Sequence, residues 1–126
     1  MPFCERRTVL MFVYDEDEEL FVADFDGIII TCDEVSDGFE ELAERVAELY
    51  PQRLEDIAAF LVREGICDCF GELTPYEIMD GLGVPRIDIG SQTVTYAEHA
   101  FDDVHIISFE YDDRELDGFM YLSIDG

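Results

Sequence analysis

The stretch LFVADFDGIIITC (residues 20–32) decides the fold of this chain. Two apolar runs that favour β-structure flank the dipeptide Asp26-Gly27. Asp-Gly between such runs is the strongest short signal for a β-hairpin, because a type I′ turn needs positive φ at both of its central residues. The sequence therefore predicts two strands, at 20–25 and 28–32, that are joined by a two-residue turn.

The residues before this hairpin extend the pattern. TVLMFVY (8–14) is rich in residues that favour β-strands, and the acidic run DEDEE (15–19) predicts a turn after it. The first third of the chain is therefore expected to form a three-strand antiparallel meander.

The same stretch also permits a catalytic interpretation. An apolar strand that runs into Asp24-Phe25-Asp26-Gly27 begins the active site of phosphatases of the haloacid dehalogenase type, where the first aspartate attacks phosphorus and the second handles the proton. That fold needs strands and helices that alternate around a parallel sheet, whereas here a second strand follows the glycine directly. The sequence favours the hairpin, and a phosphatase that uses Asp24 and Asp26 is kept as a third hypothesis.

The middle of the chain has helical periodicity. Apolar residues follow the i, i+3, i+4, i+7 spacing in two segments: Phe39, Leu42, Ala43, Val46 and Leu49, then Leu54, Ile57, Ala58 and Leu61. Pro51 lies between the two segments and predicts that one helix stops and another begins, because proline suits the first turn of a helix. Gly65 is expected to end the second helix.

A third, short helix is predicted from Thr74-Pro75-Tyr76-Glu77, which is a capping box with proline at the first helical position. Strands are expected after it at residues 86–89, 93–96, 104–111 and 119–124. In the last of these, Met120, Leu122 and Ile124 are expected to share one face of the sheet.

The order of strands, helices and strands predicts an α+β fold, with a largely antiparallel sheet and two to three central helices packed on one face. The chain has 126 residues, of which 48% are hydrophobic, so it can bury one core. We expect residues 1–126 to form a single domain.

Net charge is the strongest compositional signal. The chain has 32 Asp and Glu residues against 7 basic residues, all of them arginine, and its net charge is -25. Such like charge repels itself and favours a cationic protein as partner. Nucleic acid and anionic membranes are disfavoured as direct partners, because both are bound through clusters of Lys and Arg. Adaptation to a high-salt habitat is the alternative explanation of the charge.

The sequence indicates a cytoplasmic protein without cofactors. No apolar run approaches the roughly 20 residues of a membrane span, and the N-terminal stretch lacks the pattern of a signal peptide. The cysteines are expected to be reduced thiols, and their spacing does not match a paired C-x-x-C zinc frame. A metal site assembled from all of them stays open as an alternative: Cys4, Cys32, Cys67 and Cys69.

No set of residues in the sequence predicts catalysis, so we expect a binding protein and not an enzyme. His99 and His105 are six residues apart, and no serine or cysteine is marked as their partner. With so many acids, pairs of carboxylates occur by chance and carry no signal for general acid-base chemistry.

The second half of the chain resembles an uncharacterised family of small acidic bacterial domains that are associated with toxin immunity. The resemblance covers roughly residues 66–126 and rests on FGELTPYEIMDGLGVPRIDI, TVTYAEHAFDDVHIISFEYDD and the closing FMYLSIDG. The matching residues are Phe101, His105, Ile106 and Gly126. The resemblance implies a cognate immunity protein that has no enzymatic role.

Charge and resemblance together predict an acidic immunity-type inhibitor of a basic, nucleic-acid-targeting bacterial toxin, such as a nuclease or deaminase, whose cleft it occludes. The alternative is a nucleic-acid mimic that blocks a defence or host protein. The expected partner-binding residues are the acids of three short runs: Asp15, Glu16, Asp17, Glu18, Glu19, Asp102, Asp103, Asp112 and Asp113.

Overall fold

The structure, a computed structural model, describes residues 12–125. Seven strands form one sheet in which spatial order follows chain order. The strands are β1 Val13–Asp15, β2 Leu20–Phe25, β3 Ile28–Cys32, β4 Arg86–Asp88, β5 Thr93–Tyr96, β6 Ile106–Asp113 and β7 Asp117–Asp125. Neighbouring strands are antiparallel except β3 and β4, which are parallel because the helical segment connects them.

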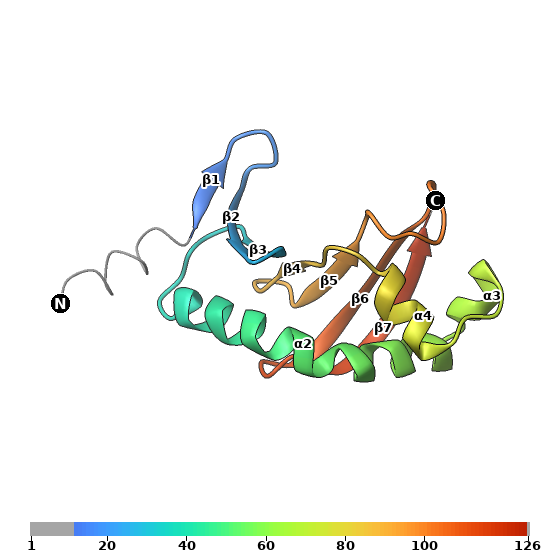
Figure 1. Ribbon diagram of the computed structural model, residues 1–126. Coiled ribbons are helices and arrows are strands. Elements are labelled where there is room, and N and C mark those ends of the chain that lie inside the picture. Colours follow the sequence, from blue (N-terminus) through green and yellow to red (C-terminus); the bar gives the residue numbers. More distant parts are fainter. Residues whose placement is uncertain (1–11, 126) are drawn as a thin grey trace.

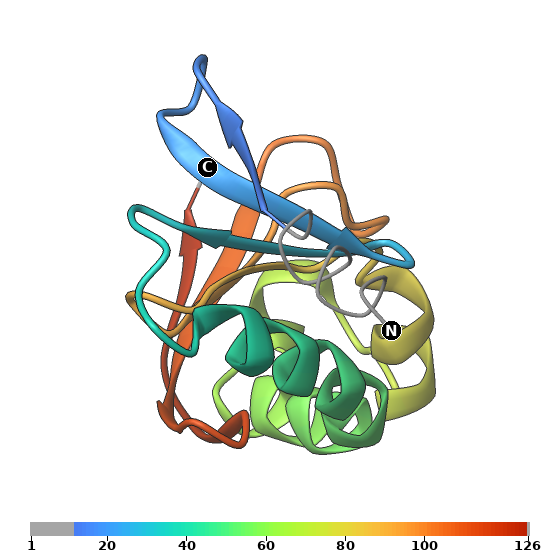
Figure 2. The same ribbon diagram turned by 90° about the vertical axis from the view of Figure 1, so that its left-hand side faces the viewer.

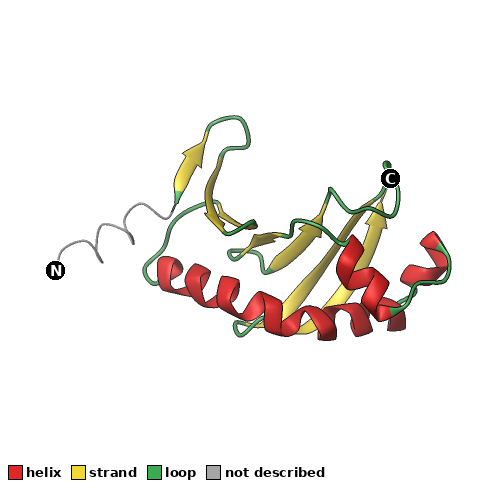
Figure 3. Ribbon diagram, in the orientation of Figure 1, coloured by secondary structure: helices red, strands yellow, loops and turns green. Residues whose placement is uncertain are grey.

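Three helices form the connection between β3 and β4: α2 Phe39–Arg63, α3 Ile66–Phe70 and α4 Pro75–Gly81. They lie on one side of the sheet, with α2 running along its length (Figures 1 and 3). The predicted α+β fold, with a largely antiparallel sheet and the helices on one face, is confirmed.

The hairpin at Asp26-Gly27 has the predicted turn. Asp26 has φ 54° and Gly27 has φ 91°, the two positive values that a type I′ turn requires. Asp24 Oδ1 accepts a hydrogen bond from the Gly27 N–H at 2.8 Å, so this carboxylate stabilises the turn. Of the first expected strand, β1 contains Val13 and Tyr14, and residues 8–11 lie outside the described part of the chain.

The predicted break at Pro51 is wrong. One helix of 25 residues runs through this position, with the proline inside it. Buried residues continue in phase across the proline, from Val46 and Tyr50 to Ile57 and Leu61, so one uninterrupted face packs on the sheet. A proline in a helix interior costs about 3 kcal/mol, while each large apolar side chain contributes roughly 1.5–3 kcal/mol when buried. Burial of the whole stripe outweighs the cost of the proline.

Replacing Pro51 by alanine is therefore expected to raise the free energy of unfolding by about 2 kcal/mol, measured by urea denaturation. The alanine N–H can donate to the carbonyl of Ala47, and part of this gain is offset because proline restricts the unfolded chain by about 0.4–1 kcal/mol. Pro75→Ala is the matched control, since Pro75 is at the first position of α4, where no intrahelical bond is lost, and it should not stabilise. A Pro51→Ala variant less stable than wild type would contradict the continuous helix.

The core lies between α2 and the inner face of the sheet. Its largest fully buried side chains include Tyr96, Phe109, Ile57 and Leu61. The hydroxyl groups of Tyr50 and Tyr96 are 2.8 Å apart in this core and satisfy one another. Burial raises the pKa of Tyr50 to about 12, so this pair stays neutral. Among the described residues, every buried side-chain polar atom has a hydrogen-bond partner.

The last strand does not alternate as predicted. Met120 pairs with Glu110 on the outer face, whereas Ile124 pairs with the buried Ile107 on the inner face. A bulge in β7 separates them, and Tyr121 has φ 59° there. The extra residue in the bulged strand shifts the alternation by one, so side chains before and after the bulge that are an even number of residues apart point to opposite faces. Met120 therefore does not share a face with Leu122 and Ile124.

Candidate functional site

Within residues 12–125, no helix covers the outer face of the sheet, which we call the open face. Side chains alternate along each strand, so the register defines which of them point to this side. From β1 to β7 the set contains Val13, Asp15, Leu20, Val22, Asp24, Ile29, Thr31, Arg86, Asp88, Thr93, Thr95, Ile106, Ser108, Glu110, Asp112, Met120, Ser123 and Asp125. Carboxylates and apolar side chains are interspersed on it.

The β1–β2 hairpin projects beyond the rest of the open face. The hairpin of β1 and β2 rises from the rest of the sheet, away from the helices (Figures 1 and 2). Glu18, in the turn of this hairpin, forms an ion pair with Arg86 of β4, with 2.5 Å between Glu18 Oε1 and an arginine Nη. This contact spans β2 and β3, so the turn leans over the face. The ion pair thus ties the turn of the hairpin to the middle of the open face.

The open face is electrically negative. Arg86 is the one basic residue that the register places on the open face, and Glu18 already neutralises it. Against this pair stand the carboxylates of Asp15, Asp24, Asp88 and Glu110. An exposed ion pair contributes only about 0–1 kcal/mol, so a ligand could displace it at little cost.

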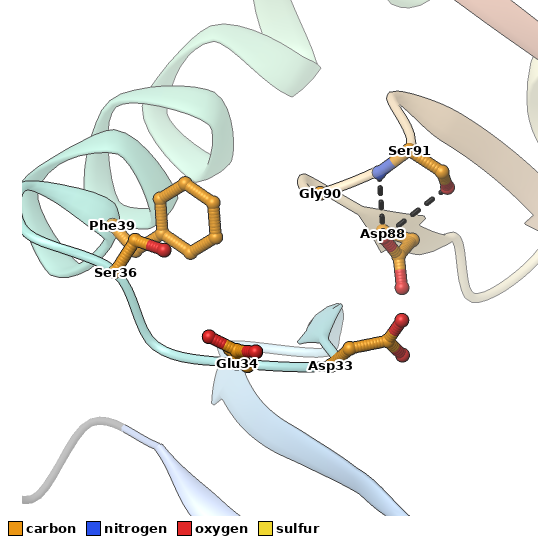
Figure 4. A pocket seen from close by; sticks show the side chains of 7 residues that line it. All are labelled: Asp33, Glu34, Ser36, Phe39, Asp88, Gly90 and Ser91. Atoms are coloured by element: carbon orange, nitrogen blue, oxygen red, sulfur yellow. Dashed lines mark hydrogen bonds between the residues drawn. The ribbon is translucent and has the colours of Figure 1, made fainter.

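Two surface pockets lie at this face. One, of about 760 Å³, is lined by both strands of the hairpin, including Val13, Tyr14 and Val22. The other, of about 460 Å³, lies where β3 and β4 end, and Figure 4 shows Asp33 and Asp88 pointing into the same space there. Asp88 is held by its neighbours, since it accepts hydrogen bonds from Ser91 and from the Thr31 hydroxyl.

Cys32, at the end of β3, is buried beside this second pocket, and the pocket's acids Asp88 and Asp33 affect its pKa. Burial, and then the negative charges of Asp88 and Asp33, raise the pKa of this thiol to about 11. It therefore stays protonated at neutral pH and is a poor nucleophile. Cys32, Cys67 and Cys69 are free thiols, while Cys4 lies outside the described residues. In residues 12–125, no group of three His, Cys, Asp or Glu side chains is arranged to hold a metal ion.

Exposed apolar side chains accompany the negative charge. Val13 is 67% exposed and Ile106 is 45% exposed, one on each half of the open face. Tyr121, at the bulge of β7, is 71% exposed. Large apolar side chains that a rigid sheet holds in water are the type of residue that supplies binding energy at protein interfaces.

The structure divides the acids that were expected to bind a partner. Asp15 lies at the end of β1, and its carboxylate accepts hydrogen bonds from the N–H groups of Asp17 and Glu18, which orders the turn. Glu16 and Glu19 are exposed beside it. This run borders the open face directly.

The other two runs do not join it in one patch. Asp112 and Asp113 end β6, where alternation places Asp112 on the open face, but five interstrand spacings of about 4.8 Å from β1. Asp102 and Asp103 precede the opposite end of β6, and that strand is about 23 Å long at roughly 3.3 Å per residue. The three runs therefore do not form one continuous acidic patch. Asp33 and Asp88, which the sequence did not single out, and Asp24, which it singled out only for a phosphatase, lie closer to the first run.

Asp102 is used within its own loop. Its Oδ1 accepts hydrogen bonds from the N–H groups of Val104 and His105, and its Oδ2 lies 2.5 Å from Nδ1 of His105. His99 is also structural: its Nδ1 accepts from the Phe101 N–H, so its Nε2 carries the proton and donates to the carbonyl of His105. The rings of His99 and His105 both pack on Phe70. These contacts explain both histidines without a catalytic role.

The Asp102 loop gives a pH prediction. Hydrogen bonds from the N–H and the imidazole of His105 and from the Val104 N–H lower the pKa of Asp102 to about 2. A carboxyl group with a lowered pKa stabilises the fold above its unfolded pKa of about 4 and loses that contribution as the pH falls towards 2. NMR titration of the Asp102 carboxyl carbon should show a midpoint near 2, and the acid-induced loss of stability between pH 4 and 2 should be smaller in Asp102→Asn. A midpoint near 4 would contradict these hydrogen bonds.

Most arginines in the described part of the chain lie away from the open face. Of the five arginines in residues 12–125, four belong to α2 or to the β6–β7 turn, and Arg86 alone belongs to the open face. Arg45 pairs with Glu115 at 2.7 Å, and Arg53 donates to the carbonyl groups of Glu115 and Leu116. These arginines tie the β6–β7 turn to α2.

Comparison with protein-family models, with curated proteins and with solved structures gives no match for this chain. Within the described part of the chain, the helices lack the length and apolar character that a membrane span requires. The site must therefore be interpreted from its own geometry and charge.

Proposed function

We propose that the protein is an acidic immunity-type inhibitor, which binds a basic, nucleic-acid-targeting bacterial toxin and occludes its active-site cleft. The observation that carries the proposal is the open face, where carboxylates surround exposed apolar residues and the one arginine is neutralised from within the chain. Such a surface is complementary in charge to a cationic surface of another protein.

The open face can contribute both to the rate of association and to the affinity. A negative field over the face steers a cationic partner and raises the rate of association by about 10- to 1,000-fold. The affinity then comes from apolar side chains that lose water in the contact, for which Val13, Ile106 and Tyr121 are available. Nucleases and deaminases that act on nucleic acid carry basic clefts, so the surface that binds substrate is also the surface that binds this inhibitor.

The experiment is affinity capture from the native host, followed by identification of the bound protein. A basic toxin that loses activity in stoichiometric complex with this chain supports the proposal. A defence protein that binds DNA or RNA would support the alternative, a nucleic-acid mimic. A Mg²⁺-dependent phosphatase activity of the purified chain that Asp24→Asn abolishes would overturn both.

One control distinguishes the two explanations of the net charge, which are a partner-binding surface and adaptation to a high-salt habitat. If the charge reflects a high-salt environment, the domain should unfold when salt is removed, because self-repulsion is then unscreened. The proposal instead requires a cooperative fold at about 0.1 M salt, which circular dichroism and urea denaturation can check. Loss of the fold below molar salt would contradict it.

A further inference from the structure

A third pocket lies on the helical side of the molecule, between α2 and α4. It has a volume of about 720 Å³ and is lined mainly by apolar atoms. Its residues are Glu55 of α2 and, from α4 and its N-cap, Thr74, Pro75, Tyr76, Met79 and Asp80. None of the residues that line it belongs to the open face.

The wall formed by α4 is rigid. The Thr74 hydroxyl accepts from the Glu77 N–H at 3.1 Å, and the Glu77 carboxylate accepts from the Thr74 N–H at 2.9 Å. The inner side of α4 is anchored in the core through Ile78, which is fully buried. Side chains on its outer side are therefore held in place before any ligand arrives.

Tyr76 has no structural reason for its position. It is 76% exposed, more than any other large apolar or aromatic residue in the described chain, although it belongs to a well-capped helix. Met79 is partly buried in the same pocket, where its thioether lies against the core. Carboxylates of Glu55 and Asp80 complete the pocket, and no basic side chain lines it.

We infer that this pocket binds an arginine side chain of a protein partner. A guanidinium group stacks on an aromatic face, packs its methylene stem on apolar atoms, and is held by carboxylates at the rim. Tyr76, Met79 and the acids Asp80 and Glu55 supply these contacts. The net charge of -25 disfavours a second copy of this chain as the occupant, as it does any anionic ligand.

This inference is independent of docking at the open face, because the two sites share no residue. A protein that has both sites could grip a cationic partner at two points, or bind two different partners. The chemistry of the pocket alone defines the class of ligand, which is a planar cation on a flexible stem.

The experiment uses the methionine methyl groups as probes. The chain has four methionines, of which Met79 lines the pocket and Met120 points to the open face. Protein with ¹³C-methyl methionine is titrated with N-acetyl-arginine N-methylamide, and Met79→Leu and Met120→Leu variants assign the two signals. The Met79 signal is expected to shift saturably with a Kd in the millimolar range, which corresponds to about -4 kcal/mol or weaker.

Matched controls test the chemistry. The blocked amide of citrulline has the same shape without the charge, and it should shift the Met79 signal at least about 5-fold less. Tyr76→Ala should reduce the response to arginine similarly, and Asp80→Asn should weaken its dependence on salt. Val62→Ala, which removes an exposed side chain of α2 that does not line the pocket, should leave the response unchanged.

Three results would overturn the inference: an equal response to citrulline, an undiminished response in Tyr76→Ala, or a Met79 signal that does not move. Movement of the Met120 signal without that of Met79 would also overturn it, and would leave the proposal for the open face intact.

Discussion

Reversal of three charges in the β1–β2 turn, Glu16→Lys, Asp17→Lys and Glu19→Lys, is expected to slow association with the cationic partner by about 10- to 100-fold. These side chains are exposed beside the open face, and none of them accepts a hydrogen bond that orders the turn. The reversal therefore removes the steering field at this edge and leaves the fold in place. Stopped-flow or surface-based kinetics at about 0.1 M salt measures the association rate constant.

A matched variant distinguishes local from overall charge. Glu41, Glu44 and Asp56 are exposed on α2, and changing these three to lysine alters the net charge by the same amount. This helical variant should slow association by less than about 3-fold, because the Debye length at that salt concentration is about 10 Å. Equal effects of the two variants would mean that only net charge matters and that the open face is not the docking surface.

Replacement of Phe109 by alanine is expected to lower the free energy of unfolding by about 3–5 kcal/mol, the largest effect on stability in this account. Phe109 is 1% exposed and is central to an aromatic cluster, with ring centroids 5.3 Å from Phe60, 5.5 Å from Phe119 and 6.3 Å from Tyr96. The cluster joins α2 to β5, β6 and β7, so the cavity left by the ring would weaken contacts between four elements. Urea denaturation measures the loss.

Tyr121→Ala is the control for this change. It removes a ring of similar size from the same region of the sheet, but from an exposed position at the bulge. Its effect on stability is expected to stay within about 0.5 kcal/mol. Similar losses in both variants would place Tyr121 in the core and would contradict the bulged register of β7.

Local signals in the sequence predicted the turns and most elements well. Asp26-Gly27 and the Thr74 capping box both specify their backbone conformation through the residues themselves, and the structure confirms both. The α+β arrangement followed from element order, since helices inserted between two groups of strands can cover only one face without a further crossover.

The sequence predictions were wrong where tertiary contacts determine the local conformation. Pro51 is a strong local helix breaker, but the apolar stripe on both sides of it has one common face to bury, and that burial decides the outcome. The bulge at Tyr121 contains no glycine or proline. The alternation of apolar residues in the strand therefore did not predict that Met120 points to the outer face. The short helix α3 lies in a stretch with too few residues for a periodic signal.

The candidate site was only partly predictable. The run from Asp15 to Glu19 was visible as a concentration of charge, and it does border the open face. Asp24, Asp33 and Asp88 are isolated acids in a chain that has 32 of them, and only the strand register brings them together. The separation of Asp102-Asp103 from Asp112-Asp113 by the length of β6 is equally a property of the fold and not of the sequence.

Hydrogen exchange in the complex with the protein that co-purifies from the native host tests the docking of a cationic partner on the open face most directly. Docking on the open face predicts that the partner is basic. It also predicts that hydrogen exchange slows in the β1–β2 hairpin (residues 13–25) and in β7, while the exchange rates of α2 are unchanged. An acidic partner, or protection confined to the helices, would contradict it.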